Sequence, residues 1–139
     1  MKYGKLNVVV GAIGIVMASI GGIVLGLTYN HLFDSGSYAI DLTRALFKAA
    51  HTHGQPIAMY NLIFAMLIDR VALANISKRR ASLAAAISML LPVGMVLRGL
   101  THGSMLFSPV AMVGVFALMI SAGYLLSGCR ELTLENEGR

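Results

Sequence analysis

The sequence contains few of the groups on which soluble enzymes and disulfide-bonded proteins depend. Only 12% of its 139 residues are charged, tryptophan is absent, and Cys129 is the one cysteine. A single cysteine excludes an intramolecular disulfide and a zinc site built from several cysteines. The chain also lacks a glycine-rich phosphate loop and a Ser/His/Asp grouping, which disfavours nucleotide enzymes and hydrolases. We therefore assign no catalytic residue and expect no catalytic activity of its own.

Apolar residues, in contrast, are abundant. They make up 57% of the chain, more than a soluble domain of this length can bury. Four apolar runs approach the roughly 20 residues that a membrane span requires. The sequence thus predicts an all-α integral membrane four-helix bundle, with residues 1–139 forming a single transmembrane domain. The expected spans are about 7–27, 49–70, 81–98 and 105–127.

The second run has an amphipathic lead-in at residues 38–48. Asp41, Arg44 and Lys48 share one face of this segment if it is helical. It either lies on the membrane surface or leads directly into the second span. Pro56 either starts that span or kinks a longer helix. No other turn-forming residue separates the two halves, so we favour a long second helix kinked at Pro56.

The distribution of basic residues predicts the orientation. Eight of the 11 lysines and arginines fall on the side that carries both ends of the chain. Cytoplasmic loops are enriched in such residues, so both termini and the tail at 128–139 are predicted to be cytoplasmic. We expect a multi-pass protein of a bacterial inner membrane. Because the basic residues flank apolar runs, the net charge of +5 indicates contact with the lipid bilayer and no nucleic-acid partner.

The same topology places all four histidines on the outer side. His51 and His53 are separated by about 200° on a helix, so one of them should face the bundle. Together with His31, His102 or the thioether of Met105, it could bind copper, zinc or haem iron. Two alternatives remain open: ordinary interfacial histidines, or proton transfer at a quinol.

Arg98 closes the third run on that side. It either extends to the outer interface or pairs with a cofactor carboxylate or an anionic lipid. The predicted cofactor-binding residues are therefore His51, His53 and Arg98, with haem or copper as the possible cofactor.

Small residues recur at every fourth position of the first run. Gly14, Ala18, Gly22 and Gly26 would form a stripe along one helix face. Such stripes let two membrane helices approach closely, so the stripe predicts a docking seam within the chain or with a neighbouring protein.

The segment Arg44–Gly54, with its Ala-His-Thr-His-Gly sequence, resembles the opening of the second helix in a group of small bacterial four-helix membrane proteins of unknown function. A similar histidine pair occurs in distant relatives of the haem-copper oxidase core subunit, where histidines ligate haem or copper. A remoter similarity is to MAPEG, a family of four-helix glutathione-linked membrane enzymes, through chain size and an arginine ahead of Ala-His. The Asn-x-x-Glu that should follow in MAPEG is missing here.

These observations predict a small accessory subunit of a membrane redox or metal-handling complex. Its outer-face histidines would contact haem, copper or a quinol. The first alternative is a purely structural subunit or homo-oligomer that packs through the glycine stripe, and the second is a MAPEG-like membrane enzyme.

Overall fold

The computed structural model describes residues 1–28 and 42–137, with side chains described up to Cys129. Within these ranges the chain is helical and contains no strand, which confirms the predicted all-α class. His31, Asp41 and most of the loop before the lead-in lie outside the described residues. The elements are α1 (Lys5–Leu27), α3 (Leu42–Leu67), α4 (Asn75–Ile87), α5 (Leu90–Leu100), the 3₁₀ turn η1 (Met105–Phe107) and α6 (Ser108–Glu137).

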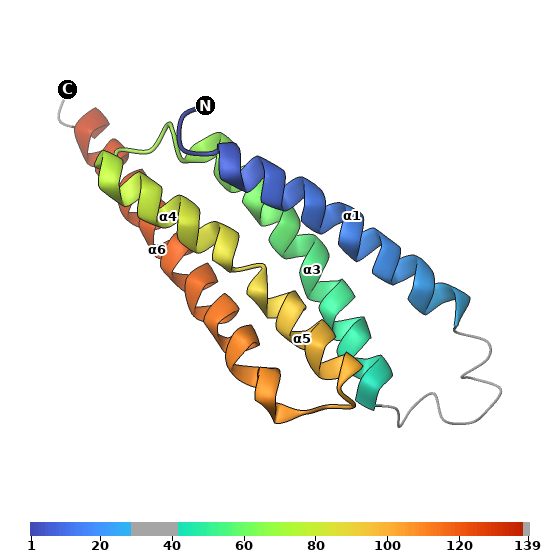
Figure 1. The fold of residues 1–139 in the computed structure, drawn as a ribbon. Coiled ribbons are helices and arrows are strands. Elements are labelled where there is room, and N and C mark those ends of the chain that lie inside the picture. The colour runs from blue at the N-terminus through green and yellow to red at the C-terminus, as the bar shows by residue number, and fades with distance from the viewer. Residues whose placement is uncertain (29–41, 138–139) are drawn as a thin grey trace.

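The helices lie lengthwise beside one another, as Figure 1 shows. The α1 helix packs along α3, α3 packs against α5, and α6 runs beside both α4 and α5. The start of α1 and the end of α6 lie at the same end of the molecule (Figure 1). This order leaves α3 between α1 and α5, so α3 has neighbours on two sides.

Three helical stretches are long and apolar enough to cross a membrane. They are Lys5–Leu27, Asn75–Leu100 and Met105–Cys129. The α3 helix, on which the predicted second span falls, is not among them. It is 26 residues long but carries several polar side chains along its middle. Whether α3 crosses the membrane therefore stays a prediction.

The α3 helix continues through Pro56 as a single element, with the proline side chain exposed. Proline has no N–H, so the carbonyl of Thr52 loses its usual helical partner without the helix ending. Residues 42–48 of the lead-in form the first turns of this same helix. The structure thus has the long helix that we favoured over a start at Pro56.

The third apolar run is divided into two helices at Ser88 and Met89. Pro92 cannot donate to the Ser88 carbonyl, and the N–H of Leu91 donates to it instead, at 3.1 Å. Further along α5, a Cβ added to Gly94 would lie 2.5 Å from the backbone nitrogen of Ala111. Glycine at this position therefore allows α5 and α6 to approach backbone to backbone.

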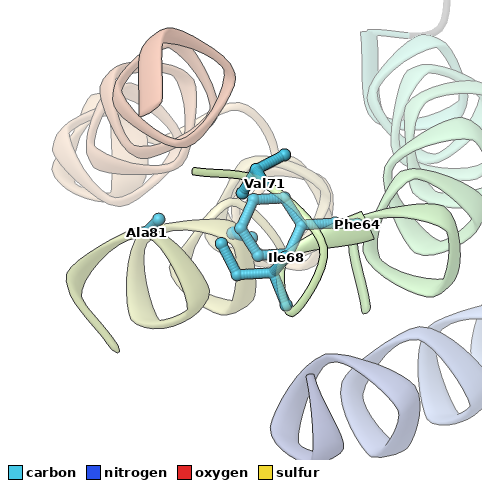
Figure 2. Packing of buried hydrophobic residues seen from close by; sticks show 5 residues of the cluster. Phe64, Ile68, Val71 and Ala81 are labelled. Carbon is cyan, nitrogen blue, oxygen red and sulfur yellow. The ribbon is translucent and has the colours of Figure 1, made fainter. Parts of the chain in front are cut away.

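A cluster of buried apolar side chains fills the end of the molecule where α3 finishes (Figure 2). Phe64 and Ile68 are fully buried, and Val71 follows from the connection to α4. Ala81 and Ala85 close the cluster from α4. Because the cluster contains residues of both α3 and α4, it holds these two helices together at this end of the molecule.

Candidate functional site

The α3 helix carries polar side chains on two faces, and this division defines the candidate site. Arg44 and Asn61 are buried and His51 is half-buried. On the remaining surface, His53 and its neighbours Thr52 and Gln55 are exposed. Arg44, His51 and Asn61 form hydrogen bonds with α1. Within the described part of the chain, the side chains of Thr52, His53 and Gln55 form no hydrogen bond with another helix.

Arg44 connects the start of α3 to the end of α1. Its Nη1 donates to the Thr28 hydroxyl at 2.9 Å, and its Nη2 donates to the Leu25 carbonyl at 3.0 Å. Cations favour the last turn of a helix, where carbonyls lack intrahelical partners. The amphipathic pattern had placed Arg44 on one polar face with Asp41 and Lys48, opposite the apolar side of the segment. The structure instead buries Arg44, because its guanidinium donates to the Thr28 hydroxyl and the Leu25 carbonyl, and it exposes Leu42 and Ala45.

His51 also binds α1. Its Nδ1 lies 2.8 Å from the Ala18 carbonyl oxygen. A carbonyl only accepts, so Nδ1 donates the hydrogen of this bond. The imidazole also packs on Gly22, where an added Cβ would lie 2.6 Å from Cε1. His51 is thus the inward-facing histidine that the helical spacing predicted.

His53 points to a different side of α3 and is exposed, as are Thr52 and Gln55. Its depth follows from the next residue, because a Cβ on Gly54 would be 3.4 Å from Ala18 and 3.6 Å from Pro92. Ala18 and Pro92 stand nine and eight residues before the ends of α1 and α5. At the helical rise this is about 12–14 Å. His53 therefore lies well away from the outer ends of the helices, whereas we had expected it at the outer end of the second span.

His102 lies elsewhere, in the turn after α5. It is exposed and has a positive φ of 51°, in the left-handed conformation that commonly ends helices. Gly103 follows with its N–H donating to the Arg98 carbonyl at 2.7 Å. A Cβ on Gly103 would meet Leu42 at 2.5 Å, which sets this turn beside the start of α3. His102 is thus roughly 13 Å along α3 from His51.

Arg98 and Met105 lie together at this end. The Arg98 Nη2 is 3.3 Å from the Met105 sulfur. The Nε of Arg98 is buried and has no hydrogen-bond partner in the described part of the chain. In the described part of the chain, neither Arg98 nor Met105 forms a hydrogen bond with His51 or His53. The predicted pairing of Arg98 with a cofactor carboxylate or an anionic lipid stays a prediction.

The described histidines do not form a cluster. Among the side chains of residues 1–28 and 42–129, no three His, Cys, Asp or Glu residues lie close enough to hold a metal ion. His51 and His53 face different ways, and His102 is displaced along the helix axis. A metal site with three such ligands would need a residue outside the described ranges, such as His31, or ligands from another protein. The metal site therefore stays a prediction.

The glycine stripe is used inside the molecule. Gly14 and Ala18 are buried and Gly22 contacts His51, whereas Gly26 has no neighbour within 4 Å among the described residues. The buried positions in this part of the chain are separated alternately by three and four residues, as in a coiled-coil seam. This spacing differs from the uniform four-residue spacing of the predicted stripe. The buried positions are Gly4, Asn7, Gly11, Gly14 and Ala18.

A buried polar network joins α1, α3 and α4, and the sequence analysis missed it. The Asn7 Nδ2 donates to Asn61 Oδ1 and to the Ser82 carbonyl, both at 2.9 Å. The Ser82 hydroxyl donates to Asn7 Oδ1, and Asn61 donates to the Ile57 carbonyl. The available signal was the presence of asparagine within apolar runs, since such residues form interhelical hydrogen bonds in membranes.

Asp69 fastens the residues ahead of α1 to the end of α3. Its carboxylate accepts from the backbone N–H groups of Lys2, at 2.6 Å, and Tyr3, at 3.0 Å. Burial raises the pKa of Asp69, but these hydrogen bonds and the positive charges of the N-terminus and Lys78 outweigh it. The pKa is therefore lower than that of a free aspartate.

Comparison with known proteins identifies no relative. No family model, curated protein sequence or solved structure matches this chain. The resemblance of residues 44–54 to small four-helix membrane proteins, and the remoter one to MAPEG, stay predictions. The candidate site consequently depends on the geometry of α3 alone.

Proposed function

We propose that the chain is a four-span protein of a bacterial inner membrane, with both termini cytoplasmic. The exposed surfaces of α1 and α6 support this topology, since they carry large apolar side chains such as Ile13, Val16, Phe116 and Met119. The fourth span is α3, whose buried polar groups are hydrogen-bonded to α1. Internal pairing of this kind lets a helix of low hydropathy cross a bilayer.

The distribution of basic residues supports the orientation. Lys2 and Lys5 stand at the start of α1, Arg70 follows the end of α3, and the run Lys78–Arg80 lies in the first half of α4. These three helix ends lie at the same end of the molecule (Figure 1). The three basic residues assigned to the opposite side are Arg44, Lys48 and Arg98. An excess of lysine and arginine marks the cytoplasmic side.

Within the membrane, the protein functions as a small accessory subunit of a redox or metal-handling complex. The observation that carries this proposal is the set of exposed polar side chains on α3, where Thr52 and His53 are adjacent and Gln55 lies at the other edge of the same exposed surface. Polar and ionisable side chains facing lipid at this depth are unfavourable and usually mark functional sites. This group is therefore the surface that a partner subunit or its cofactor covers.

The imidazole of His53 supplies the chemistry of this surface. A neutral imidazole ligates haem iron or copper, and it also exchanges a proton with a quinol near neutral pH. One histidine leaves the remaining ligands to the partner, in agreement with the spacing of the described histidines. The glycine stripe faces α3, so a homo-oligomer would have to use another face, such as this one.

The proposal is tested on protein extracted from its native membrane in mild detergent. We expect a Soret band, bound copper or extractable quinone in the wild type. The bound component should be lost in His53→Ala and retained in His102→Ala, which removes an exposed histidine from the turn after α5. A colourless, metal-free and quinone-free protein with the same co-purifying subunits in wild type and His53→Ala would overturn the proposal.

A further inference from the structure

A surface cavity lies between the start of α1 and the first half of α4. Its volume is about 250 Å³. Cationic and apolar side chains line the cavity. It lies at the end of the molecule where the basic residues are concentrated, far from His53. The lining residues are Lys2, Tyr3, Lys5, Leu6, Arg79, Ser82 and Leu83.

The cations of this cavity are available to a ligand. Lys5 and Arg79 are exposed, and neither forms a hydrogen bond or ion pair given for the described residues. The Lys2 ammonium lies 5.4 Å from the centre of the Tyr3 ring, in a geometry that also leaves it accessible. The nearby carboxylate of Asp69 is bound to backbone N–H groups and does not line the cavity. The cavity therefore has an excess of positive charge.

The apolar side chains continue from the cavity toward the middle of the helices. Leu6 and Leu83 line it and are 46% and 55% exposed. On α1, Val9 and Ile13 follow Leu6 on the same helix face and are also exposed. The surface thus changes from cationic at the helix ends to apolar along their length, which is the order of groups in an anionic phospholipid.

We propose that this cavity binds the headgroup of an anionic phospholipid. Its phosphate lies between Lys5 and Arg79, and an acyl chain follows Leu6, Val9 and Ile13 along α1. Basic pockets between membrane helices on the cytoplasmic side recognise such headgroups through charge. The inference depends on the proposed membrane insertion and is independent of any role of His53.

Native mass spectrometry of the full chain tests the inference, with phosphatidylglycerol and phosphatidylcholine of matched acyl chains as probes. We expect one phosphatidylglycerol to be retained in preference to phosphatidylcholine. The double variant Lys5→Gln/Arg79→Gln should bind phosphatidylglycerol about ten-fold more weakly or worse. Arg79→Lys should retain most of the binding, because it keeps the charge.

Arg80→Gln is the matched control, since Arg80 is exposed and adjacent but does not line the cavity. It should bind phosphatidylglycerol as the wild type does. Equal retention of both lipids by the wild type, or equal loss in Arg80→Gln and the double variant, would overturn the proposal. A separate fractionation measures whether the protein leaves the membrane only when detergent is added. This measurement distinguishes a failure of membrane insertion from a failure of lipid binding.

Discussion

The α3 and α6 helices are similar in length, at 26 and 30 residues, but they treat their polar residues differently. The described part of α6 is mostly apolar and exposes large side chains such as Phe116 and Met119, and its buried Ser121 pairs with Tyr60 of α3. The α3 helix instead has Arg44, His51 and Asn61 on the sides that contact other elements. It then leaves His53 exposed.

This difference separates two ways in which a helix fits a membrane protein. A lipid-facing helix such as α6 is stabilised by its own hydropathy, whereas α3 is stabilised by what it contacts. The polar residues of α3 that meet α1 hold the fold. Its exposed polar residues make no such contribution and are therefore free to serve a function.

The largest expected effect comes from separating α3 from α1. In Gly11→Leu the new side chain would collide with α3, because even a Cβ lies 2.8 Å from the Ala58 carbonyl and 2.9 Å from Leu62. We expect the free energy of unfolding to fall by about 3 kcal/mol or more. Gly21→Leu is the control, with no described neighbour within 4 Å. Unfolding in a detergent titration measures both, and equal losses would contradict the α1–α3 seam.

The buried network gives the next effect. Asn61→Leu removes the acceptor of the Asn7 amide and with it this link between α3 and α1, so the free energy of unfolding should fall by about 2 kcal/mol. The control Met119→Leu changes an exposed residue of α6 and should alter it by less than about 0.5 kcal/mol. A loss for Asn61→Leu no larger than for this control would show that the network does not hold α3.

The two histidines of α3 sharpen the comparison within one helix. His51→Ala removes the hydrogen bond to Ala18 and the packing on Gly22, so it should lower the free energy of unfolding by about 1 kcal/mol. His53→Ala should leave it nearly unchanged, since the side chain is exposed. If His53→Ala destabilises the protein as much as His51→Ala does, the division into a structural and a functional face is wrong.

Asp69 gives the smallest effect, at the end of α3. Its pKa is lower in the folded protein than in the unfolded chain, so its contribution is complete above the unfolded pKa and is lost as the pH falls through the folded pKa. Wild-type stability should therefore decrease in acid by about 0.5 kcal/mol more than that of Asp69→Asn. Parallel stability curves of the two proteins between pH 7 and pH 3 would contradict this role.

The sequence predicted the helical class, the long α3 and the inward direction of one histidine, because these follow from hydropathy and helical spacing. It could not predict which polar residues pair across helices. The Asn7–Asn61 bond joins positions 54 residues apart, and the burial of Arg44 depends on where α1 ends. The depth of His53 likewise became clear only from the packing of Gly54 against Ala18 and Pro92.

The central claim is that another component covers the exposed polar face of α3 in the native membrane. Site-specific photo-crosslinking from position 55, which is exposed and lies three residues from Thr52 on the same side of α3, tests it most directly, with position 119 on the apolar face of α6 as the control. The account predicts a discrete adduct with one partner subunit from position 55 and only lipid adducts from position 119. The same adducts from both positions would contradict it.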